Sequence, residues 1–415
     1  MITLSHRNMN TSGPQSEQCG NALPAKIVLV GNYPPDKQQS MLKLGNLMRD
    51  VLEESGFKTE TVHPIDRVGR LRRVFPCCDK WLGYIDKYLV FPFDLLGHFA
   101  RTRAEKACVY HITDHSNAVY SLLLRHRPRV VTCNDVLAIR SALGEIPENP
   151  TGFTGRLLQR AILTGLRHSP RIVCISENSA QELSLLLGNG VQKITSALLP
   201  LNYDFHPVPE AEARQAIGVL GVEVARAVEQ GYILHVGGNQ WYKNRIGVVR
   251  IYKELARRKR AAGEAVPPLV LAGKEPDEAL ARLIGEDKTL PVHLVDRPGD
   301  EQVRALYSLA RVLLFPSLQE GFGWPIVEAM ACGCPVVTTR RAPMTEAGGE
   351  AAIYIDPADV ESATLAVDEL LGWSEAERAA RVERGFAHVA RFSRQSLAAH
   401  YASAYKDVLP AGKNS

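Results

Sequence analysis

The chain has 415 residues, 45% hydrophobic and 23% charged, a composition that excludes a wholly disordered chain, collagen and a coiled coil. This length predicts roughly two to three domains, and no run of about 18 apolar residues is present, so we expect no transmembrane helix. The formal net charge of +4 is too small to indicate nucleic-acid binding by itself.

The cysteines and the N-terminus bear on the compartment in which the protein works. The eight cysteines are dispersed and form no C-x-x-C pair, which disfavours structural disulfides and zinc and favours a reducing cytoplasm. The N-terminus lacks the apolar segment of a secretory signal. Residues 1–24 are polar and are predicted to form a disordered tail.

Short apolar runs alternate with helical patterns along the first half of the chain. Predicted strands lie at residues 27–30, 59–62, 107–112, 129–133 and 171–175. Predicted helices lie at residues 40–55, 118–124, 155–166 and 178–187. This alternation is typical of an α/β domain, in which helices cover both faces of a parallel sheet.

A second alternating series begins at residue 232. Its predicted strands are 232–236, 268–272, 292–294, 312–315, 335–338 and 352–355, and its predicted helices are 246–259, 277–284, 300–310, 325–331 and 360–371. Residues 198–231, which contain three prolines, form the predicted linker. We expect two doubly wound Rossmann-like domains, 25–205 and 206–390, with ligands bound in an interdomain cleft at the strands' carboxyl ends. In residues 391–415 we expect a helix that packs back on the first domain, then a short tail.

The segment after the fourth strand of the second series carries the clearest pattern. Gly321 and Gly323 permit a tight turn, and Pro325 suits the first turn of a helix. The free amides of that turn, together with the helix dipole, form an anion site. Glu320 lies on the loop, and Glu328 lies about one turn into the helix, where a carboxylate can accept hydrogen bonds from a ribose diol. Either glutamate alone is explained by an ordinary helix start, but their coincidence with the turn favours a site.

Glu320 and Glu328, separated by seven residues, resemble the E-x7-E signature of retaining glycosyltransferases of family 4, also called glycosyl transferases group 1. The segment EGFGWPIVEAMACGCPVV is similar to that family almost letter for letter. The resemblance covers roughly residues 26–405 and is strongest at 230–360. It implies a GT-B fold of two facing Rossmann-like domains, in which the second, through Gly321, Phe322, Gly323 and Glu328, holds most of a nucleotide-sugar. It also implies retention of anomeric configuration without a metal ion, and a nucleotide diphosphate-sugar as co-substrate with no cofactor.

The loop from His235 to Asn244 resembles the family's loop that ends in a lysine. Lys243 would hold the donor diphosphate, where negative charge grows as the bond to the sugar breaks. Many family members have an arginine where this chain has Gly238, so one expected cation is missing, and Arg245 could substitute for it. The alternative for Lys243 is an ordinary solvated lysine. Gly238 would line the same diphosphate subsite.

The first half carries the predicted acceptor side of the cleft. Residues 110–116 resemble the family's histidine-containing loop that faces the transferred sugar. We favour His115 over His111 because it lies further past the strand end, and a structural histidine is the alternative. Asn32, Tyr33 and Asp36 follow the first strand and are predicted to face the acceptor. That loop lacks G-x-G-x-x-G, which disfavours a nicotinamide enzyme.

Two further segments have counterparts in the family. Residues 342–346 resemble the loop that carries LPE in relatives, and we expect them to line the nucleotide or sugar pocket. Residues 131–135 resemble the family's T-x-H-D stretch, with Asn134 in place of the usual histidine. A role for Asn134 in the chemistry is therefore not implied.

Segment 67–106 combines nine Lys and Arg and seven aromatic residues with four acidic ones. Basic and aromatic side chains together suit the anionic interface of a bilayer. The alternative is an ordinary helical hairpin with one buried face. Binding of single-stranded nucleic acid is disfavoured because no RNA-binding module accompanies the segment.

The resemblance implies a hexosyltransferase (EC 2.4.1-type) of polysaccharide or glycolipid assembly, with Glu320, His115 and Lys243 as catalytic residues. A hexosyl unit would move from GDP-mannose or a UDP-hexose to a hydroxyl of a glycan or lipid-linked saccharide. Retention permits a front-face route, which we favour, or a double displacement. The expected location is cytoplasmic or peripheral on the inner membrane face. The alternatives are another GT-B reaction, such as a sugar-phosphate synthase or nucleotide-sugar epimerase, and a non-catalytic binding protein.

Overall fold

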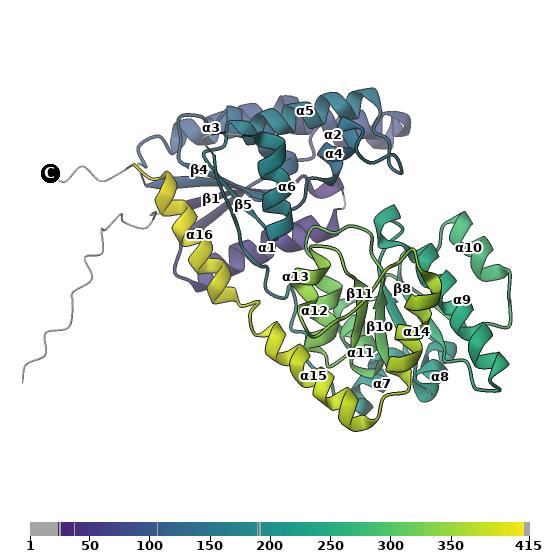
Figure 1. The fold of residues 1–415 in the computed structure, drawn as a ribbon. Coiled ribbons are helices and arrows are strands. Elements are labelled where there is room, and N and C mark those ends of the chain that lie inside the picture. Colours follow the sequence, from purple (N-terminus) through teal and green to yellow (C-terminus); the bar gives the residue numbers. More distant parts are fainter. Residues whose placement is uncertain are drawn as a thin grey trace, which may run out of the picture.

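The computed structural model describes residues 24, 26–36, 38–105, 107–188, 190 and 192–410. These residues form two domains, each built on a six-stranded parallel sheet with helices on both faces (Figure 1). The expected α/β fold of two Rossmann-like halves is therefore confirmed. The predicted N-terminal tail, apart from Pro24, lies outside the described residues, and so does the end of the chain after Pro410.

The first sheet has the strand order β2-β1-β3-β4-β5-β6, and all neighbouring strands are parallel. Its strands are β1 (Lys26–Val30), β2 (Thr59–Val62), β3 (Cys108–Ile112), β4 (Arg129–Cys133), β5 (Arg171–Cys174) and β6 (Lys193–Ser196). The chain places β2 on one side of β1 and β3 on the other, so the strand order reverses between β1 and β3. The loops that follow these two strands diverge at this switch point, where sheets of this kind bind ligands.

Two layers of helices enclose this sheet. One face is covered by α1 (Gln39–Glu54) and by the last helix of the chain, α16 (Arg394–Val408). The other face is covered by α3 (Phe91–Arg101), η5 (His115–Leu122), α4 (Leu137–Leu143), α5 (Phe153–Arg167) and α6 (Glu177–Leu187). The helix expected at 118–124 is instead the 3-10 helix η5, which starts where the Asp114 side chain accepts a hydrogen bond from the Ser116 amide.

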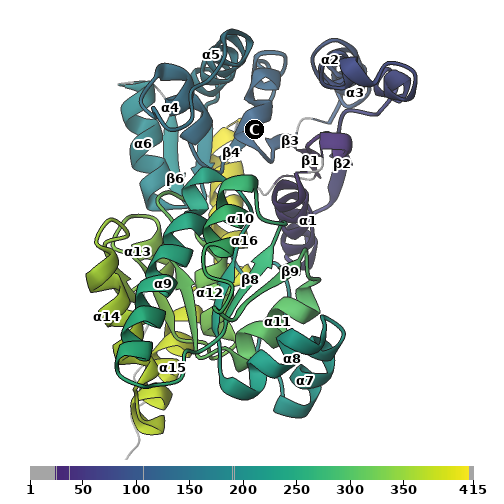
Figure 2. The same cartoon turned by 90° about the vertical axis from the view of Figure 1, so that its right-hand side faces the viewer.

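Between β2 and β3 the chain forms a run of short helical elements at the outer end of the first domain (Figure 2). They are η2 (Gly69–Arg73), η3 (Pro76–Cys78), α2 (Asp79–Ile85) and the π-helical turn η4 (Asp86–Val90), which continues into α3. Phe91 and Leu95 bury one face of α3 against the sheet. Segment 67–106 is therefore helical with one face in the core, and Lys106 is not among the described residues.

The second sheet has the order β12-β11-β10-β7-β8-β9 and is also parallel throughout. Its strands are β7 (Ile233–Val236), β8 (Leu269–Gly273), β9 (Val292–Asp296), β10 (Val312–Phe315), β11 (Val336–Thr339) and β12 (Ile353–Ile355). The switch point lies between β7 and β10, because β8 and β9 extend the sheet on one side and β11 and β12 on the other.

Helices again cover both faces. One layer is α9 (Arg245–Ala261), α10 (Glu278–Gly285) and α14 (Val360–Leu371), and the other includes α7 (Glu210–Gly218), α8 (Val222–Gln230), α11 (Asp300–Leu309) and α12 (Trp324–Ala331). The short elements η6 (Trp241–Lys243) and α13 (Met344–Gly348) lie in loops at the carboxyl ends of β7 and β11.

The prediction of a linker over residues 198–231 is wrong in its second half. Residues 210–230 form α7 and α8, and α7 packs along α11. Ala213 and Ile217 on α7, like Val224 and Val228 on α8, repeat at helical spacing and are buried. The segment that connects the domains is therefore the shorter stretch between β6 and α7.

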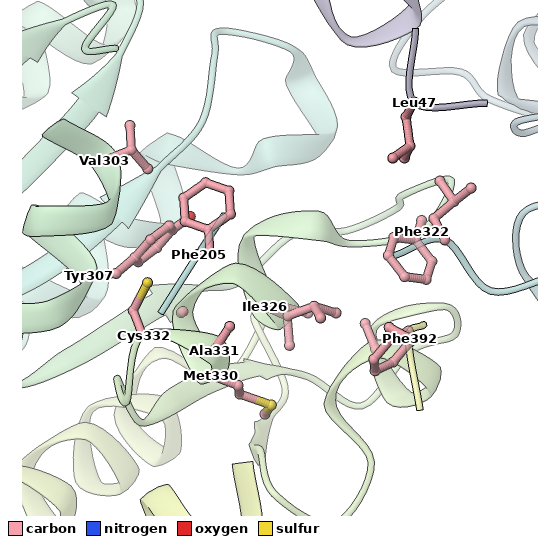
Figure 3. Packing of buried hydrophobic residues seen from close by; sticks show 14 of the residues in the cluster. Leu47, Phe205, Val303, Tyr307, Phe322, Ile326, Met330, Ala331, Cys332 and Phe392 are labelled. Atoms are coloured by element: carbon pink, nitrogen blue, oxygen red, sulfur yellow. The ribbon is translucent and has the colours of Figure 1, made fainter. Parts of the chain in front are cut away.

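The chain crosses between the domains a second time near its end. Helix α15 (Glu375–Val389) packs on α12 of the second domain, and α16 then packs on β4, β5 and α1 of the first (Figure 1). One hydrophobic cluster runs through this boundary, and Figure 3 shows Leu47 of α1 on the side of Phe322, with Ile326 and Phe392 beyond it. The two domains are thus packed against each other rather than joined only by a tether.

Candidate active site

Two loops of the second domain meet at the carboxyl ends of β7 and β10. The amide of Leu318, in the loop after β10, donates to the Tyr242 carbonyl, in the loop after β7, at 2.7 Å. Asn244 adopts a left-handed backbone (φ 52°), and its side chain caps α9 by accepting from the Gly247 amide. The same side chain donates to the Pro316 carbonyl at 3.0 Å. Asn244 therefore fixes both loops, a role that the sequence analysis did not assign.

Lys243 and Glu320 face each other across these two loops. The Lys243 Nζ atom lies 2.7 Å from Glu320 Oε1, and the two side chains are only 14% and 8% exposed. The Ser317 hydroxyl donates to the same Oε1 atom at 2.8 Å. Lys243 is therefore not the solvated surface lysine that was the alternative, and the pair places a cation and a carboxylate at the switch point of the sheet.

Helix α12 begins beside this pair. Gly323 caps the helix with φ of 103°, a backbone conformation that favours glycine, and Pro325 stands in the first turn. Pro325 has no amide hydrogen and the Ile326 amide already donates to the Gly323 carbonyl at 3.0 Å, so the turn offers an anion the positive end of the helix dipole and the amides that precede Pro325. Phe322, which was expected to contact the donor, is 4% exposed and packs edge-on against Phe392 in the hydrophobic cluster.

Glu328 lies on α12, facing α11. Its side chain accepts a hydrogen bond from the Tyr307 hydroxyl at 3.1 Å. Burial raises the pKa of the Glu328 carboxyl to about 7, although the hydrogen bond from Tyr307 opposes this shift. Hydrogen-bond donors that reach this carboxyl would favour its charged form and lower its pKa. The sequence analysis missed Tyr307, which lies 21 residues away in the chain.

The loops that follow β7 and β8 lie very close together. A Cβ atom on Gly273 would lie 2.0 Å from the Gly237 carbonyl oxygen, so only glycine fits there. The buried Arg245 guanidinium donates to the carbonyl of Lys274 and to the Asn239 side chain, and thereby braces these loops. These bonds use the Nη1 atom, whereas the Nε and Nη2 atoms of Arg245 are buried without a hydrogen-bond partner in the described chain, so Arg245 as the second cation stays a prediction. At Gly238 a Cβ atom would come 2.5 Å from the Gln240 side chain.

The first domain presents His115 at the carboxyl end of β3. Its Nδ1 atom accepts a hydrogen bond from the Asn134 amide at 3.3 Å and lies 3.3 Å from Asp114 Oδ1. His111 instead lies in the core between Thr132 and Tyr405, where burial lowers its pKa to about 3. Of the two histidines, His115 is the one located at the strand end.

The predicted acceptor residues do not share one environment. Asn32 lines a cavity of about 330 Å³ at the carboxyl ends of β1 and β3, together with Thr113 and Met41. Tyr33 is buried and is not a lining residue of that cavity, because its hydroxyl donates into an inner cluster. Asp36 is paired with Lys87 at 2.7 Å. Of the three predicted acceptor residues, Asn32 is therefore the one that lines the cavity, beside Gly31 and Pro34 of the same loop.

The two halves of the site are in contact. A Cβ atom on Gly321 would lie 2.6 Å from the carbonyl oxygen of Asn134, which belongs to the first domain. Glu320 precedes Gly321 and is therefore one residue away from this contact with the first domain. Asn134, on the other side of the contact, donates its backbone amide to His115. Lys243, Glu320 and His115 thus lie around one interdomain junction.

A second junction lies beside it. Glu346 of α13 accepts hydrogen bonds from the amides of Glu177 and Asn178, at 2.7 and 2.9 Å, and so caps α6 of the first domain. Residues 342–346, expected to line a pocket, therefore also hold the domains together. Lys43 of α1 and Asp300 of α11 form a further interdomain ion pair at 2.5 Å.

Within the described chain, no three His, Cys, Asp or Glu side chains are grouped so that they could hold a metal ion. None of the helices that the structure describes is both long and apolar enough to cross a membrane.

Comparisons with known proteins agree with this geometry. Residues 230–372, which contain the Lys243 loop and α12, match the family model Glycosyl transferases group 1. The O-antigen chain mannosyltransferase B of Escherichia coli is 28% identical over 305 residues, 71% of this chain and 76% of that protein. The MMP alpha-(1->4)-mannosyltransferase of Mycolicibacterium hassiacum is 36% identical over 121 residues, 28% of this chain and 29% of that protein.

Solved structures show the same architecture. A UDP-forming trehalose-phosphate synthase from Burkholderia xenovorans superposes with a TM-score of 0.66 at 13% identity, covering 94% of this chain and all of that one. The Anabaena protein HepE, solved with UDP and glucose, superposes with a TM-score of 0.61 at 14% identity, covering 92% of this chain and 98% of that one. The chain is a hexosyltransferase with the GT-B fold, and its residues 230–372 form a glycosyl transferases group 1 domain.

Proposed function

We propose that this protein transfers a hexosyl unit from a nucleotide diphosphate-sugar to a hydroxyl of a glycan or lipid-linked saccharide, with retention of anomeric configuration. The observation that carries the proposal is the Lys243–Glu320 pair beside the start of α12, at the switch point of the second sheet. Two relatives are named mannosyltransferases, so GDP-mannose is the first donor to test and the UDP-hexoses are the second.

The donor would lie along the second domain. Its diphosphate would accept hydrogen bonds from the amides at the start of α12 and from the Lys243 ammonium. In this scheme the diphosphate needs no metal ion or cofactor. Its ribose diol would donate to Glu328, which has at present one hydrogen bond from Tyr307. Glu328 would bind the ribose, away from the bond that breaks, whereas Lys243 would bind the diphosphate, beside that bond.

The sugar would lie between the domains, near Glu320 and His115. In a front-face reaction the bond from the anomeric carbon to the phosphate oxygen breaks, and the acceptor oxygen bonds to that carbon on the same face. The acceptor proton passes to the departing phosphate oxygen. Lys243 stabilises the charge that grows on the diphosphate, and Glu320 orients the sugar or stabilises its oxocarbenium-like charge.

The acceptor would enter from the first domain, where the cavity beside Asn32 opens. Relatives named for O-antigen synthesis support a saccharide acceptor and a role in polysaccharide or glycolipid assembly. The seven described cysteines are free thiols, which supports a reducing, cytoplasmic location.

The test uses the purified full chain. A ligand that binds only the folded state raises the melting temperature, so GDP- and UDP-sugars are screened by thermal shift. Donors that bind are then tested for nucleotide release with crude lipid acceptors, in parallel with Glu320→Ala. The proposal expects one nucleotide family to stabilise the protein and release to disappear in the variant. No shift with any nucleotide-sugar would favour the non-catalytic binding protein.

A further inference from the structure

Exposed apolar side chains are concentrated at one end of the first domain. Of the nineteen large hydrophobic side chains that are exposed in the described chain, eight lie between Ile65 and Leu96. Single exposed apolar residues are normal on a protein surface, but a cluster marks a surface that meets a partner. The eight are Ile65, Leu71, Val74, Phe75, Trp81, Leu89, Phe93 and Leu96.

The densest part of this cluster lies on η2 and α2, which pack on each other and on the intervening η3. We call it the η2–α2 patch. Its apolar members are 48% to 67% exposed, and three basic residues alternate with them along the chain. The patch comprises Arg70, Leu71, Arg73, Val74, Phe75, Lys80 and Trp81.

The free charge of the patch is positive. In the part of the chain that the structure describes, its three basic side chains enter no salt bridge. The neighbouring acids are already taken, because Arg72 binds Asp66 and Asp79, and Arg67 binds Asp94. The positive charge of the patch is therefore not balanced by nearby acids.

We propose that the η2–α2 patch docks on the surface of an anionic lipid bilayer. Trp and Phe side chains are suited to the headgroup boundary, and Arg and Lys bury their stems there while their charges reach lipid phosphates. Arg and aromatic residues are also common in protein interfaces, so the unbalanced positive charge is what decides between a protein and a bilayer. Three unpaired cations among exposed apolar side chains are more complementary to the negative headgroups of a bilayer than to a protein surface.

The patch is fixed to the loop that follows β1. Asp86, just after α2, accepts hydrogen bonds from the amides of Val68 and Gly69 at the start of η2, and from the Tyr33 hydroxyl at 3.0 Å. Lys87 pairs with Asp36 at 2.7 Å and lies 4.8 Å from the centre of the Tyr84 ring. A bilayer on the patch would therefore be held near the acceptor cavity. That consequence rests on the proposed function, whereas the docking of the patch on a bilayer does not depend on it.

The test measures binding of the full chain to vesicles without any donor. Sedimentation compares vesicles of phosphatidylcholine with vesicles that contain an equal part of phosphatidylglycerol, at low and high salt. Binding is expected only to the anionic vesicles and to weaken with salt. The double variant Arg70→Gln/Arg73→Gln should bind roughly 25-fold more weakly, and Phe75→Ser/Trp81→Ser roughly tenfold more weakly.

Matched variants on other surfaces provide the controls. Lys288→Gln/Arg384→Gln removes two exposed cations, and Leu185→Ser/Leu365→Ser removes two exposed apolar side chains far along the chain from the patch. Both should bind as the unaltered protein does, and all variants should keep its melting temperature. Brominated lipids should quench tryptophan fluorescence in the unaltered protein and not in Trp81→Phe.

Two results would overturn the proposal. One is equal binding to neutral and anionic vesicles, or none to either, which would leave a protein as the partner of the patch. The other is binding that the control variants lose and the patch variants keep. Because no donor or acceptor takes part, failure here leaves the glycosyl-transfer proposal standing, and a protein without transferase activity could still bind vesicles.

Discussion

The Lys243 ammonium and the Glu320 carboxylate form an ion pair of 2.7 Å that is largely shielded from water. A diphosphate bound at α12 would compete with Glu320 for the same cation. Donor binding would thereby leave Glu320 less neutralised and better able to stabilise positive charge on the sugar. The pair thus links recognition of the leaving group to the electrostatics at the reacting carbon.

Removing one partner of this pair should damage stability and activity separately. In Lys243→Met the Glu320 carboxylate stays buried without its cation, which should lower the free energy of unfolding by about 3 kcal/mol. The transfer rate should fall by roughly 10² or more because charge on the leaving diphosphate loses its stabiliser. The double variant Lys243→Met/Glu320→Gln should regain stability without regaining activity. Chemical denaturation and nucleotide release measure the two effects, and recovery of both in the double variant would contradict this account.

Glu328 should make stability depend on pH. The folded protein holds the Glu328 proton up to a pH of about 7, because burial raises its pKa, whereas the ordinary pKa of a glutamate side chain is 4.5. The folded state therefore binds more protons between these values, and the free energy of unfolding falls as pH rises through this window. Glu328→Gln has no such titration. The difference in free energy of unfolding between the variant and the unaltered protein should therefore rise in favour of the variant by up to about 3 kcal/mol between pH 5 and pH 8. Melting temperatures across this range measure the difference, and a constant offset would contradict the assignment.

The same residue should make donor binding depend on pH in the opposite sense. An ionised Glu328 accepts two hydrogen bonds from a ribose diol, whereas a protonated one must give up an acceptor position. The dissociation constant of the donor should therefore fall between pH 6 and pH 8 in the unaltered protein. In Glu328→Gln the affinity should be weaker and independent of pH. Calorimetric titration with the intact nucleotide-sugar, without an acceptor, tests this, because its diphosphate diester does not titrate in this range, whereas the terminal phosphate of a free nucleoside diphosphate does.

Gly321 should control how closely the domains approach. A Cβ atom there would lie 2.6 Å from the Asn134 carbonyl, which is backbone and cannot rotate away. Gly321→Ala should therefore separate the two halves of the site and lower kcat at least tenfold, while the melting temperature changes little. Gly218→Ala, where no atom lies within 4 Å of the added Cβ, is the matched control and should keep full activity. Equal activity in both variants would show that the contact is dispensable.

The contact of Glu346 with α6 should contribute more to the free energy of unfolding than the ion pair of Lys43 with Asp300. Glu346 caps the start of α6 with two hydrogen bonds from backbone amides, so Glu346→Gln should cost about 1 kcal/mol. Lys43 and Asp300 are 41% and 37% exposed, so Lys43→Ala should cost less than about 0.5 kcal/mol. Small-angle scattering should show a more open average shape for Glu346→Gln. A larger effect of Lys43→Ala would reverse the order of importance.

The inner strands of both domains could be predicted because they are buried on both faces, and Val312–Phe315 matches its strand residue for residue. The edge strand Thr59–Val62 was also predicted with its bounds although it is only partly buried, whereas the edge strand β6, which is also only partly buried, was missed. Helices α7 and α8 were missed because prolines and charges around them resemble a linker. Their burial depends on α11, which lies about a hundred residues further along the chain, and local pattern does not contain that contact.

The site shows the same division. Glu320 and Glu328 could be chosen from sequence because a loop, a turn and a helix start coincide in the segment that holds them. Lys243 could be chosen because its loop resembles one of the family. Tyr307 and Asn134 could not, because each acts through a contact made only when separate strands and domains assemble. Tyr33 and Asp36 were expected to face the acceptor, and sequence could not reveal that Asp66, Asp86 and Lys87 occupy their polar atoms.

The most direct measurement is the anomeric configuration of the product formed from the donor that binds. Purified protein is incubated with that donor and a saccharide acceptor, and the new linkage is assigned by NMR before any product can be processed further. The account predicts a new glycosidic bond with the configuration of the donor, and no bond with Lys243→Met or Glu320→Gln. An inverted linkage, or donor consumed at an equal rate without an acceptor, would contradict retaining transfer at this site.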